Sequence, residues 1–160
     1  MRKNYVAYGS NMDAEQMKLR CPDSKLIGKG IIKKFRLMFK GSQSGVYATI
    51  EPAENDVVPV LLWRISAKDE KRLDRYEGFP KFYYKSEVDI VMENGQTTGG
   101  MVYIMDEKRD LGLPATYYYK LLLNAYEKFG FDKKILENAI EYSKVRQDGL
   151  FLWRKTQWAN

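Results

Sequence analysis

The chain has 160 residues, 44% hydrophobic and 30% charged, a composition that is typical of one folded domain and excludes an intrinsically disordered chain. It has no apolar run of about 18 residues, no recognisable signal peptide and only one cysteine, so we expect a cytoplasmic protein without a membrane anchor. The net charge of +6 comes from scattered lysines and arginines without a basic tract, which argues against nucleic acid as a partner.

The first half of the chain alternates between strand-forming runs and two short helices. Asp13 has the spacing of a helix cap and predicts a helix that ends near residue 20. Ser66 predicts a second helix in the same way, and Gly78 ends it. Strands are expected at residues 4–8, at 25–40 as one or two strands, at 45–53 and at 57–66.

The second half begins as a β-hairpin and then becomes helical. Asn94-Gly95 suits a type I′ turn between two strands of alternating residues, and after Pro114 the hydrophobic period changes to that of a helix. The strands are expected at residues 82–92 and 97–105, and the helices at 115–130 and 132–146. This order predicts an α+β fold: a mixed, mostly antiparallel sheet, partly closed into a barrel, with flanking helices.

The C-terminal segment differs in composition from the rest of the chain. We expect one domain over residues 1–147 and an aromatic, basic tail over 148–160 that packs on it. Trp153 and Trp158 favour packing because buried aromatic side chains contribute strongly to stability, and the alternative is a lid over a pocket.

The first expected strand runs directly into Gly9, Ser10 and Asn11. Glycine lets the backbone approach another group closely, and the helix that follows adds free N–H groups and a positive dipole end. These features predict a donor-rich pocket for a carboxylate or a developing oxyanion. The alternative is an ordinary strand-to-helix turn, since turns favour the same residues.

Glu77 lies at the C-terminal end of the second expected helix, among aromatic residues. The helix dipole already places negative charge there, and apolar neighbours disfavour a carboxylate, so both predict a raised pKa. A carboxyl group with a raised pKa suits general acid/base chemistry near neutral pH. The alternative is a solvated glutamate at a helix end.

The chain contains no histidine. This excludes Ser-His-Asp and Cys-His catalytic pairs, as well as zinc sites built on histidine. Cys21 has no histidine to activate it and is interpreted as a structural thiol. Proton transfer in an enzyme of this composition would therefore depend on carboxylates, tyrosines or lysines, and we expect no metal and no cofactor.

Two motifs occur together in a recognisable order. They are Tyr-Gly-Ser-Asn at residues 8–11 and Leu-Asp-Arg-Tyr-Glu-Gly at 73–78, followed by Pro114 and a tyrosine four residues later, Tyr118. The chain resembles the γ-glutamylcyclotransferase-like family, also called AIG2-like, over about residues 4–130. The resemblance implies the fold of that family.

The resemblance also implies a reaction and a set of residues. Enzymes of the family release a γ-glutamyl group as 5-oxoproline by attack of the substrate's own α-amine. Glu77 then corresponds to the general acid/base, and a small-molecule γ-glutamyl compound to the substrate. Tyr8, the residues Gly9, Ser10 and Asn11, and Tyr118 correspond to the substrate-binding residues.

Two questions stay open at this level. The leaving group is an amine or an amino acid, and the resemblance does not choose between them. A non-catalytic binding or regulatory module of the same fold, for an acidic partner or RNA, is the alternative to an enzyme.

Overall fold

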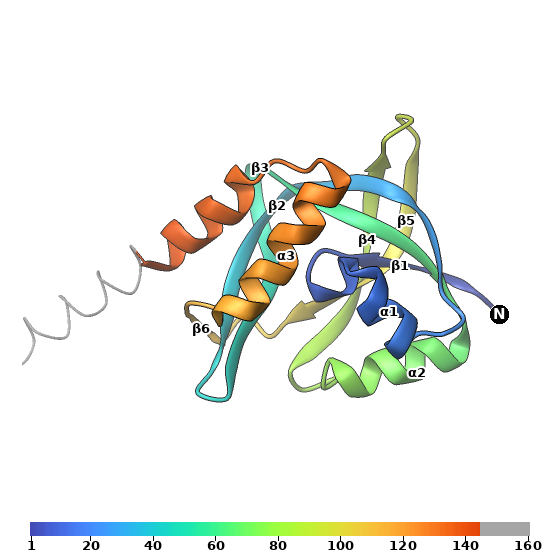
Figure 1. Ribbon diagram of the computed structural model, residues 1–160, viewed down its shortest axis with the longest axis horizontal. Helices are drawn as coiled ribbons and strands as arrows, with labels where there is room; N and C mark the ends of the chain where they lie inside the picture. Colours follow the sequence, from blue (N-terminus) through green and yellow to red (C-terminus); the bar gives the residue numbers. More distant parts are fainter. Residues whose placement is uncertain (145–160) are drawn as a thin grey trace, which may run out of the picture.

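The computed structural model describes residues 1–144, in which six β-strands form one sheet that closes into a barrel (Figure 1). The strand order is β3-β1-β5-β4-β2-β6, and additional pairing between β2 and β3 closes the sheet. The strands are β1 (Lys3–Ala7), β2 (Lys25–Ser42), β3 (Gly45–Ile65), β4 (Tyr83–Met92), β5 (Thr97–Met105) and β6 (Asp110–Leu111). The tail predicted at 148–160 lies outside the described residues.

The sheet is mixed, as predicted. β1 pairs parallel to β5 at Tyr5 and Met101, whereas the other pairings are antiparallel. β2 and β3 form a long hairpin that pairs along almost its whole length. The prediction of two strands at 45–53 and 57–66 is wrong, because β3 is continuous, and β6 was not predicted.

The β4–β5 turn differs from the type I′ turn that the sequence predicts. Gly95 has a φ of +86°, but Asn94 does not have a positive φ, which a type I′ turn requires. The Gly95 N–H donates to the Met92 carbonyl at 2.9 Å, and the Met92 N–H donates to the Gln96 carbonyl at 2.8 Å. The connection is therefore a three-residue loop with glycine in the left-handed position.

Two of the helices begin at the caps that the sequence predicts. The Asp13 side chain accepts a hydrogen bond from the Gln16 N–H, and Ser66 forms a complete capping box with Asp69. Gly130 ends the helix over residues 116–129 in the left-handed conformation. The helices are the 3-10 helix η1 (Ser10–Met12), α1 (Ala14–Arg20), α2 (Ala67–Tyr76) and α3 (Thr116–Phe129), and residues 134–144 are also helical.

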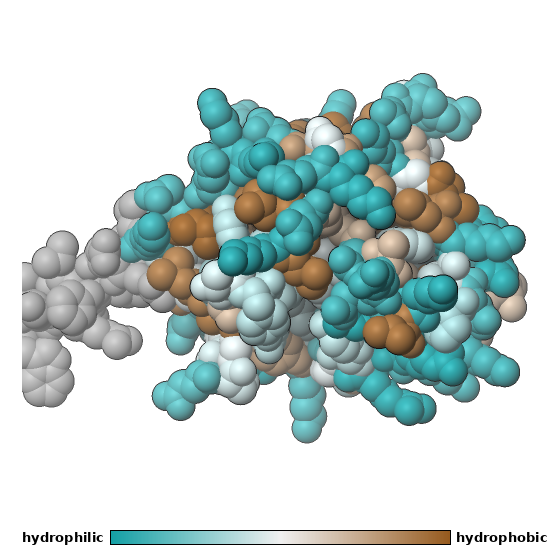
Figure 2. Space-filling model, viewed as in Figure 1, coloured by the Kyte–Doolittle hydropathy of each residue, from teal (hydrophilic) through white to brown (hydrophobic). Residues whose placement is uncertain are grey.

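The helices cover two sides of the barrel. In Figure 1, α3 and the helical residues 134–144 lie on one side, α1 and α2 lie on the other, and η1 lies between them at the end of β1. α3 buries Tyr118, Leu122, Ala125 and Tyr126, which share one face of the helix. No helix within residues 1–144 is long and apolar enough to cross a membrane. On the face shown in Figure 2, hydrophobic residues form separate patches between hydrophilic ones.

Candidate active site

A cavity of about 340 Å³ lies where the loop after β1 meets the end of α2 and the start of β4. Its wall is largely aromatic, and Glu77 is the acidic residue among those that line it. The tyrosines that line it are Tyr5, Tyr8, Tyr47, Tyr76, Tyr83, Tyr103 and Tyr118. The site residues predicted from the sequence, 8–11, Glu77 and Tyr118, all line this one cavity.

The end of α2 is held against the sheet by the residues that precede Glu77. Leu73 is fully buried in the core. Asp74 accepts a hydrogen bond from the Tyr103 hydroxyl at 2.6 Å and forms an ion pair with Lys85 at 2.8 Å. The Leu-Asp-x-x-Glu-Gly spacing therefore has a structural explanation: the first two residues fix the last turn of the helix, and the glutamate lines the cavity.

The environment of Glu77 favours its neutral form. Burial raises the pKa of Glu77 from 4.5 to about 7, and the positive charge of Arg20 partly opposes this rise. Burial, with the Glu77 charge as a smaller cause, also raises the pKa of Tyr8 well above its ordinary value. The cavity therefore contains one carboxyl group that titrates near neutral pH, beside hydroxyl groups that keep their protons.

The loop after β1 is fixed by its own side chains. The Tyr8 hydroxyl donates to the Tyr103 carbonyl at 2.5 Å, and the Asn11 side chain donates to the Tyr5 hydroxyl at 2.9 Å. The first hydrogen bond of η1 runs from the Met12 N–H to the Gly9 carbonyl at 3.0 Å. The N–H groups of residues 10 and 11 precede this bond, so they are the ones that a ligand in the cavity can use.

Tyr118 lines the cavity from the first turn of α3. Its hydroxyl accepts a hydrogen bond from the buried Ala48 N–H at 3.0 Å, and its ring packs edge-on against Tyr47 at 5.4 Å. The neighbouring Tyr117 is 73% exposed, and Tyr119 packs against Phe39 outside the cavity lining. The spacing from Pro114 therefore selects, among three consecutive tyrosines, the one that lines the cavity.

Arg20 and Tyr103 were not identified from the sequence. The Arg20 guanidinium donates to the side chains of Ser10 and Asn11. The Tyr103 carbonyl accepts a hydrogen bond from the Tyr8 hydroxyl, and the Tyr103 hydroxyl donates one to Asp74. The inward position of Tyr103 on β5 follows from strand alternation, which is a usable signal. Arg20 carries no such signal, because its contacts with Ser10 and Asn11 form only once the loop and α1 have folded.

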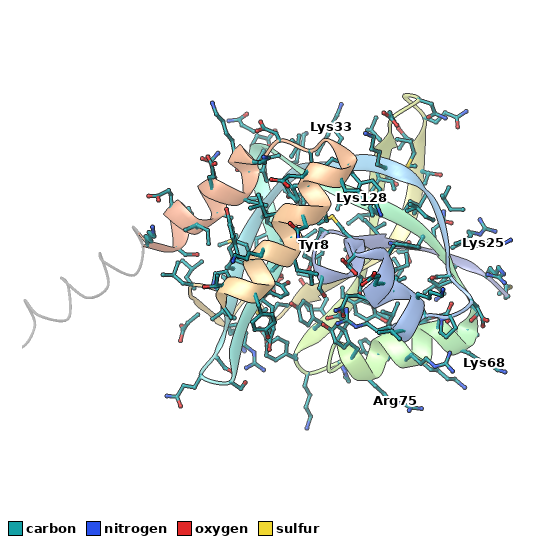
Figure 3. All side chains as sticks on the ribbon, viewed as in Figure 1. Tyr8, Lys25, Lys33, Lys68, Arg75 and Lys128 are labelled. Atoms are coloured by element: carbon teal, nitrogen blue, oxygen red, sulfur yellow. The ribbon has the colours of Figure 1, made fainter. Side chains whose placement is uncertain are left out.

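Metal-ligand clusters and basic patches were the other features to consider in the described residues. Within residues 1–144 no three histidine, cysteine, aspartate or glutamate side chains gather into a possible metal site. In Figure 3, Tyr8 lies inside the molecule, whereas Lys25, Lys33, Lys68 and Arg75 lie apart from one another at its periphery. The basic residues labelled there thus do not form a single patch.

The chain is similar in sequence to known proteins. The sequence model of the family described as gamma-glutamyl cyclotransferase, AIG2-like, matches residues 5–120. The human protein named gamma-glutamylcyclotransferase is 28% identical over 126 residues, which cover 74% of this chain and 66%, just under two thirds, of the human one. The bovine protein of that name is 27% identical over 149 residues, covering 86% of this chain and 78% of its own.

The fold is also shared with a solved structure. A solved structure entitled gamma-glutamyl cyclotransferase matches with a TM-score of 0.79 at 24% identity, and the match covers 87% of this chain and 86% of that one. The likeness of the two structures shows a shared fold, and the sequence match spans both motifs that line the cavity. The chain therefore belongs to the γ-glutamylcyclotransferase family, AIG2-like.

Proposed function

We propose that this protein is a γ-glutamylcyclotransferase-type enzyme that releases the γ-glutamyl group of a γ-glutamyl amine or γ-glutamyl amino acid as 5-oxoproline. The observation that carries the proposal is that Glu77 and the loop at residues 9–11 line one cavity. The names of the human and bovine relatives support the reaction class.

The proposed reaction needs no nucleophile from the protein. The α-amine of the substrate attacks its own γ-carbonyl carbon, so a C–N bond forms within a five-membered ring. The bond from that carbon to the leaving amine then breaks. Because the attacking amine is tethered to the carbonyl, most of the entropic cost of bringing the two together is removed.

Glu77 is the proposed general acid/base. As a carboxylate it takes a proton from the substrate ammonium, and as a carboxylic acid it gives that proton to the leaving amine. The carboxylate then takes the second proton from the ring nitrogen and passes it to the released amine, which leaves as an ammonium. A pKa of about 7 suits both steps, since neither protonation state is rare at neutral pH. No other acidic residue lines this cavity in the part of the chain that the structure describes.

The loop and Tyr118 are the proposed substrate-binding groups. The N–H groups of residues 10 and 11 would bind the substrate carboxylate or the oxyanion of the tetrahedral intermediate, and Tyr8 and Gly9 would shape the floor beneath it. Tyr118 accepts the Ala48 N–H, which leaves its own proton to donate to the substrate.

The setting that we propose is cytoplasmic, with a small-molecule γ-glutamyl compound as the partner. The buried Cys21 is a free thiol, which suits a reducing compartment. Fractionation of cells that make this protein would test the location directly.

The test is a product assay with a matched control. Wild type, Glu77→Gln and Glu54→Gln are incubated with a panel of γ-glutamyl amines and γ-glutamyl amino acids, and 5-oxoproline is quantified. Glu54 is an exposed glutamate on β3, and Glu54→Gln removes the same charge as Glu77→Gln. We expect Glu77→Gln to lower turnover by about 10²-fold or more and Glu54→Gln to leave it unchanged.

Two results would oppose the proposal. Equal turnover in Glu77→Gln and wild type would remove Glu77 from the chemistry. If no substrate of the panel gave 5-oxoproline, the result would favour the non-catalytic module.

A further inference from the structure

Arg20, the last residue of α1, turns back onto the loop that precedes its own helix. Its Nη1 donates to Asn11 Oδ1 at 2.5 Å and to Ser10 Oγ at 3.2 Å. Its Cζ lies 3.6 Å from the centre of the Tyr76 ring, and the Tyr76 hydroxyl lies 3.3 Å from Ser10 Oγ. One guanidinium thus ties the donor loop to the residue that immediately precedes Glu77.

The contacts continue around the same side of the cavity. The Asn11 side chain accepts a hydrogen bond from Arg20 through its oxygen and donates one through its nitrogen to the Tyr5 hydroxyl at 2.9 Å. The Tyr5 ring packs edge-on against Tyr103 with 5.9 Å between centroids, and the Tyr103 hydroxyl donates to Asp74 of α2 at 2.6 Å. These contacts therefore form a chain that begins at Tyr76 and ends at Asp74, both in α2. Arg20 joins the loop to α2 in this chain.

We propose that Arg20 is a positioning residue of this site, which holds the donor loop and Glu77 at a fixed separation for the cyclisation. This inference rests on the proposed function. Arg20 does not line the cavity, so it acts through Ser10, Asn11 and Tyr76. A planar guanidinium suits this task because it can donate along its edge while its face stacks on an aromatic ring.

The charge of Arg20 reaches Glu77 as well. Arg20 lowers the pKa of Glu77 against the larger effect of burial. The other titratable groups that line the cavity with Glu77 are tyrosines from β1, the loop after it, β3, α2, β4, β5 and α3, and the exposed Arg75, two residues before Glu77. The groups are Tyr5, Tyr8, Tyr47, Tyr76, Tyr83, Tyr103, Tyr118 and Arg75. Arg20 thus both contacts the loop and Tyr76 and lowers the pKa of Glu77.

The experiment compares Arg20→Gln, Arg20→Lys and Lys18→Gln. Lys18 is exposed on α1, two residues before Arg20, so Lys18→Gln removes the same charge from the same helix without touching the loop. The first readout is the titration of the Glu77 carboxyl by ¹³C NMR, its signal assigned by its loss in Glu77→Gln. We expect Arg20→Gln to raise the midpoint by about one pH unit and the other two variants to leave it near the wild-type value.

The second readout is the turnover of the best γ-glutamyl substrate. A displacement of the loop by about 1 Å can lower kcat by about 10²-fold, so we expect a loss of that order in Arg20→Gln with a smaller change in KM. Arg20→Lys keeps the charge but not the fork of donors, so we expect a normal Glu77 titration with kcat still reduced by about tenfold. A merely structural arginine would lower thermal stability and move neither readout.

The outcomes separate this inference from the proposed function. If wild type forms no 5-oxoproline, the proposed function fails, and the Glu77 titration alone decides whether Arg20 acts on Glu77. If Arg20→Gln does not fold, Arg20→Lys decides, and wild-type kcat in that variant overturns the inference. A Glu77 midpoint that stays unchanged in folded Arg20→Gln overturns it as well.

Discussion

Gly9 and Tyr118 approach each other so closely that each limits what the other position accepts. A Cβ atom at residue 9 would lie 3.2 Å from the Tyr118 hydroxyl oxygen, which itself is held by the Ala48 N–H. We therefore expect Gly9→Ala to lower the free energy of unfolding by roughly 1–3 kcal/mol, the range for an overpacked site. Turnover should fall by about tenfold, because both residues line the cavity. Urea unfolding and the 5-oxoproline assay measure the two effects.

Tyr118→Phe is the matched partner for this variant. Alone, it leaves the buried Ala48 N–H without its acceptor, which costs about 1–3 kcal/mol. In the double variant the added methyl group of residue 9 no longer meets a hydroxyl. The loss in free energy of unfolding of the double variant should therefore be smaller than the sum of the two single losses by about 0.5 kcal/mol or more. Strict additivity would show that close approach to Tyr118 is not what requires glycine at residue 9.

The start of α2 provides a test at the level of the element. The Ser66 hydroxyl accepts the Asp69 N–H at 3.1 Å and donates to the Asp23 carboxylate at 2.9 Å. Ser66→Ala should lower the free energy of unfolding by about 1 kcal/mol, while kcat below the melting transition stays at the wild-type value, since Glu77 is at the other end of the helix. Ser44→Ala, at an exposed turn hydroxyl, is the control. A parallel loss of kcat would show that the cap also sets the position of Glu77.

The helices could be predicted from the sequence because their signals are local. Asp13 and Ser66 act on backbone groups three residues away, so their effect does not depend on the rest of the fold. The continuity of β3 could not be predicted in this way. Its polar residues at 54–56 suggest a break, but in the structure ion pairs from β2 meet this part of the strand, Arg36 with Asp56 at 2.7 Å and Lys34 with Glu54 at 3.6 Å.

The candidate site could likewise be predicted only where its residues lie in local motifs. Glu77 and the loop at 8–11 lie in short motifs, and Tyr118 stands at a fixed distance from Pro114, so sequence alone could propose all three. The arrangement of Arg20 depends on the two turns of α1, which bring residue 20 back to residues 10 and 11. A contact of that kind follows from tertiary structure and has no pattern in the sequence.

At the scale of the whole molecule, the raised pKa of Glu77 links stability to pH. The pKa is about 7 in the folded protein and near its ordinary value of 4.5 in the unfolded chain. Between these values the folded state keeps a proton that the unfolded state has lost, so stability falls as pH rises through this window. We expect the stability of Glu77→Gln relative to wild type to increase by roughly 2–3 kcal/mol between pH 5 and pH 8. Chemical denaturation at both values measures this, and an equal difference at both would contradict it.

Activity should rise with pH over the range in which stability falls, because both depend on the proton of Glu77. If Glu77 accepts the proton of the substrate ammonium, the free enzyme must carry it as a carboxylate, so kcat/KM should rise with pH to a plateau whose midpoint is about 7. Measurement of kcat/KM from pH 5 to pH 9 tests this, with Glu77→Gln expected to be low and without that limb. A midpoint near 4.5 would mean that the cavity does not perturb the catalytic group. With the expected midpoint, the protein is most active in the pH range where this residue destabilises the fold most, since burial of the carboxyl produces both effects.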